Sequence, residues 1–588
     1  MRRWLVAVAG VALVVPVLAG LAQPSSWATV APSLVKVRPG VKLPMLQAAI
    51  LSAARGECEA TQLATSGPVR NLRVDASPLQ GAKGATVSPS LYREGWIEVR
   101  TASNDDGETG LWPDALIPAK DAYAGEKRQA FPASSKGSEP LVAYVEYCVP
   151  PGTAPGLYQG SVKLSADGKE ALTFPVTLKV RAFTLPATSS LPTAFGFSGL
   201  AACEGHKLSR DTAHVRELTR LYSQAALRHR ISFYGMSMEP PPFTLAGGKA
   251  TIDFSEYDDE VAPFLDGTAI SGGARFTSTD VRLHPKARSD AEKVAYWKAF
   301  AAHLRQKGWL DRAFVYAKDE PNLSELPRVK GFAGLVHQAD PGLRVLVTAS
   351  QHPLLHGAAD IFTPNINCLF KRPGAESFGY CWNLQPVESY APERKAGARL
   401  WWYQSCGSHG CGRIPAFDLT SRRYFRGWPS YMVDASGPQN RAMGVLAFLH
   451  GIEGELYYGT VEAFYSEDPG KPQPPAWDSV WRFDGNGDGT LFYPGTPERI
   501  GGTTHVPVES LRLKALRDGL EDYEYLLLAS KLGLHSEGLA AAAALAPQAF
   551  AITADIAKWQ STREALGEAI EQALKRHPEF AGAGPVQP

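Results

Sequence analysis

The sequence predicts a multidomain protein with α/β and β structure: an N-terminal β-sandwich, a (β/α)8-type barrel and a helical C-terminal extension. Three observations indicate this class. The chain has 588 residues, enough for roughly two to four domains. Short alternating strand-like runs fill its first third, as in β-sandwiches. After residue 193 strand-like runs alternate with helical ones, which favours a parallel α/β barrel over the runner-up, a doubly wound sheet.

The first 28 residues read as a secretory signal peptide. Arg2 and Arg3 form the basic region, residues 4–21 form an apolar run, and small residues follow, with cleavage expected after Ala22 or Ala28. The predicted location is therefore secreted, periplasmic or cell-surface. An uncleaved membrane anchor is the alternative. No later run is long and apolar enough to span a bilayer.

The β-sandwich is predicted over residues 33–186. Leu141–Val149 is the clearest strand-like run, and Gly160–Ser165 and Leu172–Val180 follow it. Pro175 has no backbone N–H to donate, so it predicts an edge or irregular strand at that point. Residues 187–192 look like a linker to the next domain.

The barrel is predicted over residues 193–533. The expected strands are 194–197, 231–235, 313–317, 343–348, 361–363, 400–403 and 455–458, and the expected helices are 210–228, 290–308, 324–339, 439–450 and 508–532. Gly533 ends the last of these helices. Residues 534–577 are predicted to form C-terminal helices and residues 578–588 a flexible tail.

Composition and charge exclude some function classes. The 60 Lys and Arg against 59 Asp and Glu leave a net charge of +1, without the basic excess of a nucleic-acid-binding protein. Apolar residues make up 44%, which argues against global disorder. The aromatic share of 10%, with 45 Pro and 55 Gly, is typical of a loop-rich protein with stacking surfaces, as in carbohydrate enzymes, although a large aromatic core would give the same composition.

Seven cysteines in an exported chain predict disulfides, and their odd number leaves one thiol without an internal partner. Cys406 and Cys411 bracket a loop short enough for a bridge to close. Cys368 with Cys381 is a second candidate pair. Cys406, His409 and Cys411 also permit a metal-ligand interpretation, but no fourth ligand has a matching spacing.

The most informative residues for chemistry are Asp319 and Glu320. They follow the apolar run Phe314–Ala317 and Lys318, so they are expected at the C-terminal end of a strand, where an α/β barrel has its active-site mouth. Two adjacent carboxylates repel, which predicts that one has a raised pKa and can hold a proton for donation. The alternative is a solvated pair of acids before a helix that starts at Pro321.

Several motifs, in order along the chain, resemble glycoside hydrolase family 123 and its large relative, domain-of-unknown-function family 4091. The resemblance covers about residues 35–576. The motifs are Gly56–Gln62, Tyr316-Ala-Lys-Asp-Glu-Pro321, Leu400-Trp-Trp-Tyr-Gln-Ser-Cys406, Gly451–Tyr458, Asp484–Gly495 and Leu513–Leu526. Each is weak alone, but their common order is specific for the family. It is less specific for the substrate.

The resemblance implies a retaining β-N-acetylgalactosaminidase, an enzyme of β-N-acetylhexosaminidase type that uses the 2-acetamido group of its substrate as the nucleophile. Such substrate-assisted enzymes depart from the scheme in which two carboxylates flank the bond. Carried over, Glu320 is the general acid and then the base, and Asp319 orients the acetamido nitrogen. Two rivals stay open: a hydrolase of another glycan, and a non-catalytic glycan-binding envelope protein. No cofactor is needed.

Aromatic residues near two other strand ends are candidate substrate contacts. Side chains along a strand point alternately to its two faces, so in the run Trp401-Trp402-Tyr403 either Trp402 or the Trp401–Tyr403 pair faces inward. An indole stacks on a sugar face, and a phenol can hydrogen-bond the acetamido oxygen. Tyr458 is favoured over Tyr457 because it lies nearer its strand end. Core packing is the alternative for each.

No metal is predicted. Asp484, Asn486, Asp488 and Gly489 fit the first half of a calcium loop, but Gly495 stands where the last ligand, usually Glu, is expected, so a tight structural turn is preferred. The expected partner is an N-acetylhexosamine-containing glycan, with no nucleic acid and no transmembrane segment after signal removal.

Overall fold

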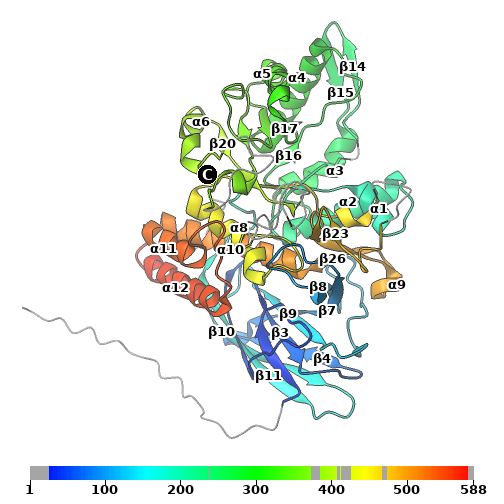
Figure 1. Cartoon of the computed structure of the whole chain (residues 1–588), viewed down its shortest axis with the longest axis vertical. Coiled ribbons are helices and arrows are strands. Elements are labelled where there is room, and N and C mark those ends of the chain that lie inside the picture. Colours follow the sequence, from blue (N-terminus) through cyan, green and yellow to red (C-terminus); the bar gives the residue numbers. More distant parts are fainter. Residues whose placement is uncertain are drawn as a thin grey trace, which may run out of the picture.

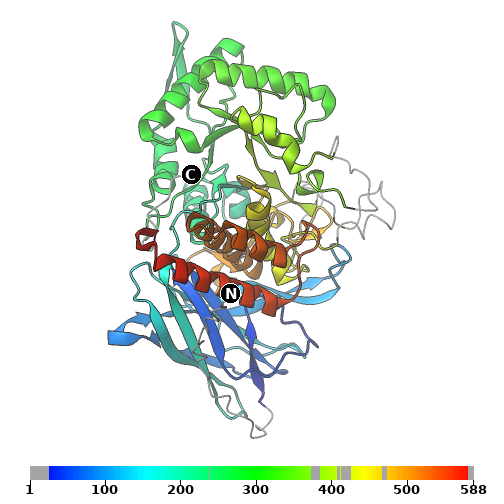
Figure 2. The same ribbon diagram turned by 90° about the vertical axis from the view of Figure 1, so that its left-hand side faces the viewer.

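The computed structural model describes residues 26–237, 239–372, 384–406, 411, 426–466 and 473–580. It confirms a mixed α/β protein built on several sheets. Two mainly antiparallel sheets form one end of the molecule, and two parallel sheets with their helices form the other (Figure 1). The C-terminal helices lie at the junction between the two ends (Figure 2). The predicted signal peptide, residues 1–28, lies outside the described residues up to residue 25.

The first sheet has seven strands and the second has six. The first has the order β1 (Ala28–Pro32), β3 (Cys58–Thr65), β9 (Val142–Cys148), β7 (Pro89–Val99), β8 (Gly110–Pro118), β26 (Val506–Ser510) and β25 (Phe492–Gly495). The second has the order β2 (Ala49–Arg55), β11 (Leu172–Thr184), β10 (Gly156–Ser165), β5 (Leu79–Gln80) and β6 (Thr86–Val87), with β4 (Arg73–Ala76) paired to β10. Residues of both sheets share one apolar core.

The alternation along β11 explains its place in that core. Phe174, Val176 and Leu178 occupy every second position and are all buried. β11 lies between β2 and β10, but Pro175 itself pairs on one side only, so its position is locally an edge. The strand tolerates it because Pro175 is opposite Ser161 of β10, while β2 pairs with β11 only from Val176 onward.

All strands of the other two sheets are parallel to their neighbours. The four-stranded sheet has the order β13 (Phe233–Tyr234), β12 (Thr193–Gly196), β22 (Glu455–Tyr457) and β21 (Trp402–Tyr403). The five-stranded sheet has the order β16 (Thr279–Asp280), β17 (Ala313–Lys318), β18 (Arg344–Val347), β19 (Ile361–Phe362) and β20 (Arg399–Leu400). Apart from β16, they lie where the sequence predicts strands.

The two parallel sheets meet on both sides. On one side β20 and β21 are consecutive in the chain: the Trp401 N–H donates to the Phe362 carbonyl at 2.8 Å, and the Trp402 N–H donates to the Gly454 carbonyl at 3.2 Å. On the other side, side chains span the gap between β13 and β16. The Thr277 N–H donates to Ser232 Oγ at 2.7 Å.

The helices surround these sheets. Their bounds are α1 Gly199–Gly205, α2 Thr212–Arg228, α3 Ser255–Asp266, α4 Asp290–Lys307, α5 Leu326–Ala339, α6 Ala391–Lys395, α8 Gly437–His450, α9 Pro497–Ile500, α10 Leu511–Lys531, α11 His535–Leu545 and α12 Ile556–Leu574. Two small hairpins complete the structure: β14 (Phe243–Ala246) with β15 (Lys249–Ile252), and β23 (Trp481–Arg482) with β24 (Gly485–Asn486). Among the described residues, no helix has both the length and the apolar character to cross a membrane.

Local sequence explains where helix α4 begins and ends. Ser289 accepts a hydrogen bond from the Glu292 N–H, and the Glu292 side chain accepts one from the Ser289 N–H, which makes a reciprocal capping box. Gly308 ends the helix in the left-handed region with φ of 73°. This helix leads into β17 and therefore helps to position the residues that follow that strand.

Helix α10 starts later than the sequence predicts. Residues 506–510 form β26, which pairs with β8, and Ser510 then caps the helix by accepting from the Leu513 N–H. The alternating Val506 and Val508 suit a strand, and pairing with a distant strand decides the boundary. The predicted barrel range thus contributes β25 and β26 to the first sheet.

Buried ion pairs connect α10 to that sheet. Lys514 Nζ lies 2.9 Å from Glu146 of β9, and Arg517 lies 2.6 Å from the same carboxylate. Arg512 pairs with Asp114 of β8 at 2.8 Å. Within the helix, Arg517 and Glu521 also pair, at 3.9 Å, which is longer than the contact of Arg517 with Glu146. Because removing one partner leaves a buried charge unpaired, these contacts fix the helix in one position.

Disulfides link strands and close a loop. Cys406 bonds to Cys411, which confirms the prediction. Cys58 bonds to Cys148, directly opposite it in the pairing of β3 with β9, and this bridge was not predicted. Cys368 is disulfide-bonded, and Cys381, its predicted partner, lies outside the described residues, as does His409. The free, buried thiol is that of Cys203.

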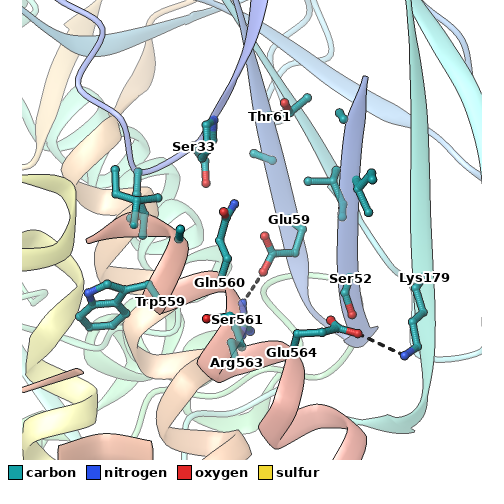
Figure 3. A pocket seen from close by; sticks show the side chains of 18 of the residues that line it. Ser33, Ser52, Glu59, Thr61, Lys179, Trp559, Gln560, Ser561, Arg563 and Glu564 are labelled. Atoms are coloured by element: carbon teal, nitrogen blue, oxygen red, sulfur yellow. Dashed lines mark hydrogen bonds and ion pairs between the residues drawn. The ribbon is translucent and has the colours of Figure 1, made fainter. Parts of the chain in front are cut away.

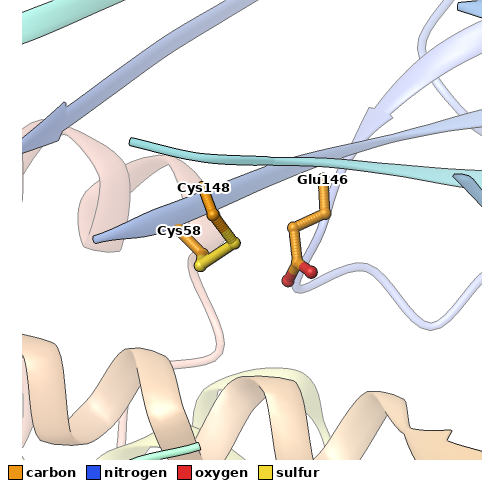
Figure 4. A group of neighbouring side chains, drawn as sticks. All are labelled: Cys58, Glu146 and Cys148. Atoms are coloured by element: carbon orange, nitrogen blue, oxygen red, sulfur yellow. A yellow bond between two sulfur atoms is a disulfide. The ribbon is translucent and has the colours of Figure 1, made fainter. Parts of the chain in front are cut away.

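Glu146 lies beside the Cys58–Cys148 bridge (Figure 4). This is the one grouping of metal-ligand side chains found among the described residues. Both sulfurs are bonded to each other, and Glu146 is bound by Lys514 and Arg517. The thiolates that a metal needs are therefore not present, and the grouping is structural.

Removing the Cys58–Cys148 bridge should destabilise the protein. Its two cysteines are 90 residues apart, so the bridge restricts a long loop in the unfolded chain. Cys58→Ala with Cys148→Ala should lower the free energy of unfolding by about 2–4 kcal/mol, measured by denaturant titration. Cys203→Ala is the matched control, because it removes a buried thiol without removing a bond. An equal effect of both changes would contradict a stabilising role for the bridge.

Stability should also depend on pH through Glu455 at the start of β22. Burial raises the pKa of this carboxyl from its ordinary value of 4.5 to about 8, although a hydrogen bond from Tyr431 at 2.5 Å opposes the shift. The folded form holds the proton more tightly than the unfolded chain. The contribution of Glu455 to the free energy of unfolding is therefore complete below pH 4.5 and is lost as pH rises through about 8.

Glu455→Gln keeps an acceptor for Tyr431 and cannot ionise. Its Tm should exceed that of the parent at pH 8.5 and be close to it at pH 5, measured by calorimetry. The control is the exposed Glu98→Gln, which should follow the parent at both values. A Tm difference that is the same at pH 5 and pH 8.5 would refute the linkage.

Candidate functional site

The candidate site is built where β17 ends. The pairing of β17 with β18 is irregular there, because Tyr316 is opposite Leu346 and Lys318 is opposite the next residue, Val347. Ala317 is therefore an extra residue on β17, a bulge of the kind that redirects a strand end. The chain then turns outward through Asp319 and Glu320, at the C-terminal edge of the parallel strands, where α/β proteins bind ligands.

Hydroxyl groups hold the Asp319 carboxylate. The Tyr316 hydroxyl donates to Asp319 Oδ1 at 2.7 Å, and the Thr348 hydroxyl, from just beyond β18, donates to the same oxygen at 3.0 Å. Asp319 itself is exposed. Two donors to one carboxylate oxygen fix the direction of the side chain.

Glu320 is held by its backbone and its side chain. Its φ of 40° lies in the left-handed region, which non-glycine residues rarely adopt and which often marks functional sites. The Glu320 N–H donates to Thr348 Oγ1 at 2.8 Å. The Tyr403 hydroxyl donates to Glu320 Oε1. The two carboxylates therefore have separate partners, although they are adjacent in sequence.

The phenols around this pair remain protonated donors. Burial raises the pKa of Tyr316 well above its usual value, and the charge of Asp319 raises it further. Burial and Asp319 act in the same way on the pKa of Tyr234, whose ring centroid lies 6.2 Å from that of Tyr316. A protonated phenol can offer a hydrogen bond to a carboxylate or to an incoming polar ligand.

The three aromatic residues of the Trp-Trp-Tyr segment divide between two environments. Trp401 and Tyr403 belong to the small cluster enclosed by the parallel strands, together with Phe314. Trp402 belongs to the large core outside those strands and contacts Phe370, with ring centroids 6.3 Å apart. The inward-facing alternative is thus the Trp401–Tyr403 pair.

Of the three aromatic residues 401–403, Tyr403 is the one whose side chain contacts the carboxylate pair. Trp401 is 2% exposed and Trp402 is 0% exposed, so neither offers much surface to a sugar. The ring of Trp401 packs against Phe314, with centroids 6.5 Å apart, two positions along each strand before the residues that reach the site. Tyr403 is two residues further along the chain, on the same face, which explains why its hydroxyl can reach Glu320.

Tyr458 lies at the end of β22 and faces a neighbouring hairpin. Its backbone carbonyl accepts from the Tyr234 hydroxyl at 3.2 Å, which connects it to the site. Its own ring lies 5.7 Å from that of Phe483, and its hydroxyl has no hydrogen-bond partner among the described residues.

Sequence reasoning missed Tyr234, Tyr316 and Thr348 as site residues. Each lies at or near the end of a predicted strand, and Tyr316 is part of the same motif as the carboxylates. Their position at the strand ends was the signal in the sequence that could have identified them as site residues. The hydrogen bonds themselves join residues far apart in the chain, 83 positions for Tyr403 and Glu320 and 224 for Tyr234 and Tyr458, and no local pattern records such pairings.

Residues 484–489, which fit the first half of a calcium loop in the sequence, begin in the hairpin of β23 and β24. Asn486 Nδ2 donates to the Thr101 carbonyl at 2.9 Å, and Asp488 Oδ1 accepts from the Tyr457 hydroxyl at 3.1 Å. These two side chains, which a calcium loop would use as ligands, are therefore engaged with the protein.

A groove of about 650 Å³ lies away from the site, between β1, β2 and β3 and helix α12 (Figure 3). Ile50 and Leu157 contribute apolar surface, while Arg563 pairs with Glu59 and Lys179 pairs with Glu564. None of the six candidate site residues lines it. Its charged groups are engaged in ion pairs, Arg441 with Asp522 among them, which gives them a structural role.

The part of the chain that carries the site is similar to known glycoside hydrolases. Residues 290–529, which include both carboxylates and Tyr403, match the family model described as glycoside hydrolase 123, catalytic domain. A structure reported on glycolipid glycan hydrolysis by a family 123 glycoside hydrolase from Clostridium perfringens is similar over 94% of this chain and 99% of that chain, with a TM-score of 0.62 and 14% identity. That similarity shows a shared fold.

Two further structures are only loosely similar. A GH5 xyloglucanase of Bacteroides ovatus has 10% identity and a TM-score of 0.29 over 84% of this chain and 100% of that one. A family 39 glycoside hydrolase from Bacteroides cellulosilyticus WH2 has 9% identity and a TM-score of 0.31 over 81% of each chain. No curated protein matches the chain.

Proposed function

The chain belongs to glycoside hydrolase family 123, and we propose that it removes terminal β-linked N-acetylgalactosamine from a glycan by retaining, substrate-assisted hydrolysis. The observation that carries the proposal is the pair of adjacent carboxylates with separate hydroxyl partners. Tyr316 and Thr348 bind Asp319, and Tyr403 binds Glu320. Neighbours on one strand end are poorly placed to act as acid and nucleophile on opposite sides of a sugar ring.

The first chemical step breaks the glycosidic bond. Glu320, protonated, gives its proton to the glycosidic oxygen as that oxygen leaves the anomeric carbon. The carbonyl oxygen of the 2-acetamido group attacks the same carbon and closes a five-membered oxazolinium ring. Positive charge then spreads toward the acetamido nitrogen. An ionised Asp319 beside that nitrogen orients its N–H and offsets the charge.

The second step restores the sugar. Glu320, now ionised, takes a proton from water as the water oxygen attacks the anomeric carbon and the oxazolinium ring opens. The acetamido group is regenerated, the anomeric configuration is retained and Glu320 is again protonated. No carboxylate forms a bond to carbon, so the two acidic residues can stand side by side.

Tyr403 supports both states of Glu320 with a single hydroxyl hydrogen. When Glu320 is ionised, Tyr403 donates that hydrogen to Oε1, the contact present in the structure. When Glu320 is protonated, the same hydrogen is available to the acetamido oxygen, the role that the sequence indicates for this phenol. Tyr403 thus links the proton on Glu320 to the position of the nucleophile.

The proposal extends to the architecture and to export. A (β/α)8-type barrel is supported by the two parallel sheets, whose strands take eight positions when residues 399–403 count as one, and a β-sandwich is supported by the shared core of the other two sheets. Cleavage of the signal peptide after Ala22 leaves β1 whole, because Ala28 is paired with Thr65 and Trp27 Nε1 donates to the Glu170 carbonyl. N-terminal sequencing of the exported protein tests that position.

A panel of aryl β-glycosides tests the function. The N-acetylgalactosaminide should be the best substrate, the N-acetylglucosaminide a poorer one, and the plain galactoside, which lacks the acetamido group, should be nearly inert. Preference for another acetamido sugar would correct the sugar and keep the mechanism. Turnover of none of them, with binding of an N-acetylhexosamine glycan in a calorimeter, would favour a non-catalytic glycan-binding protein.

A further inference from the structure

The hairpin of β23 and β24 carries an exposed aromatic ring on a strained turn. Phe483 and Asp484 connect the strands as a two-residue loop, with φ values of 45° and 62°. Two positive φ values in sequence are the mark of a type I′ turn, whose first position favours Asn, Asp or Gly because a larger side chain is strained there. Phe483 is nevertheless present and is 45% exposed.

The base of this hairpin is fixed to the rest of the protein. The Asn486 side chain donates to the Thr101 carbonyl at 2.9 Å and to Ser103 Oγ at 3.0 Å. The Val433 N–H donates to the Asn486 carbonyl at 2.8 Å. Because the base is held, the turn presents Phe483 in one place, and the strain is not needed to stabilise the fold.

The hairpin lies between the ends of two strands of the candidate site. At Gly485 a Cβ would stand 2.4 Å from Cys406 Sγ, so only glycine allows this close approach to the segment that follows Tyr403. The ring of Phe483 lies 5.7 Å from that of Tyr458, which directly follows β22. The hairpin is therefore continuous with the residues around Glu320 and lies toward the outside.

A cation completes the surface. The guanidinium of Arg482 lies 5.3 Å from the ring centroid of Tyr465 and 5.2 Å from that of Phe483. Tyr458, Tyr465, Arg482 and Phe483 together form what we call the aromatic ledge. An exposed aromatic face beside fixed polar groups is suited to a pyranose, whose C–H bonds pack on the ring while its hydroxyls make hydrogen bonds.

We infer that the aromatic ledge holds the sugar to which the cleaved residue is attached, with Phe483 packing on the face of that sugar. This inference rests on the proposed function. The terminal N-acetylhexosamine must lie against Asp319 and Glu320, at the mouth of the strands that enclose Trp401 and Phe314. The remainder of the glycan then points outward. The ledge lies next to the site on its outer side, and Tyr458 connects the two. The group bound on the ledge is a neutral sugar ring.

The test compares two substrates in the full-length protein. One is an oligosaccharide with terminal β-linked N-acetylgalactosamine on galactose. The other is the β-N-acetylgalactosaminyl azide, whose leaving group has no ring to pack. Phe483→Asn should lower kcat/KM for the oligosaccharide about tenfold and leave that for the azide within twofold, because only the first substrate reaches the ledge.

The choice of Asn separates binding from folding. Asn suits the left-handed turn, so the Tm of Phe483→Asn should equal or exceed that of the parent. Phe483→Tyr keeps the ring and should keep both activities. Leu245→Asn, at an exposed apolar residue of the β14–β15 hairpin, is the control and should change neither substrate.

The outcomes are distinguishable. Equal loss on both substrates, or no loss on either, would overturn the ledge as a sugar site, and a fall in Tm would show that Phe483 serves the fold instead. If the unaltered protein cleaves neither substrate, the proposed function has failed, and the ledge, which depends on it, falls with it.

Discussion

Glu320→Gln should reduce turnover of a natural oligosaccharide by about 10²- to 10⁴-fold, the usual contribution of a general acid. The amide keeps the size of the side chain and an oxygen that can accept from Tyr403, but it has no proton to donate to the leaving group. A dinitrophenyl glycoside needs little protonation, so its bond cleavage should be much less affected. Steady-state and single-turnover rates on both substrates measure the difference.

The control for this change is Glu325→Gln. Glu325 lies five residues further along, forms a surface ion pair with Lys318 at 3.4 Å and caps the next turn, which Gln can also do. It should retain full activity. If Glu320→Gln cleaves the natural oligosaccharide at the parental rate with its Tm unchanged, Glu320 is not the acid.

Asp319→Asn should lower kcat and kcat/KM together, by about 10²- to 10³-fold, because the lost charge acts on the transition state. The amide oxygen can still accept from Tyr316 and Thr348, so the side chain should stay in place. Its charge, which offsets the positive acetamido nitrogen during ring closure, is removed. Kinetics on the aryl N-acetylgalactosaminide measure the effect.

Two further measurements separate this mechanism from one with a carboxylate nucleophile. A thiazoline analogue of the cyclised intermediate should inhibit the parent and should bind Asp319→Asn more weakly. The exposed Asp311→Asn is the matched control and should behave as the parent. Trapping a sugar covalently bound to a carboxylate, or efficient cleavage of a plain β-galactoside, is incompatible with participation of the acetamido group.

Much of the local structure was predictable because it depends on residues close in sequence. Ser289 and Glu292 mark the start of α4, and Gly308 marks its end. The apolar run before Lys318 predicts the strand, and the two carboxylates after it predict the site. The close spacing of Cys406 and Cys411 likewise predicts their bridge.

Features that depend on distant partners were not predictable. The sequence predicts a helix from residue 508, but residues 508–510 belong to the strand β26 because β8 is available to pair with it. Cys58 and Cys148 become partners only when β3 and β9 align. The sequence indicates that Pro175 belongs at an edge or irregular position, but not that β2 pairs with the rest of β11 from Val176 onward.

By itself, the sequence determined the resemblance to glycoside hydrolase family 123, the strand that carries Asp319 and Glu320, and the pair of aromatic alternatives at residues 401–403, because motifs and alternation are local properties. Only the tertiary structure decided which alternative faces the site. It also joined Tyr403 to Glu320 across 83 residues, recruited Thr348 to Asp319 and exposed Phe483 on a strained turn. The physical reason is that side-chain direction and hydrogen-bond partners are set by how strands pack together, and packing depends on residues far apart in the chain.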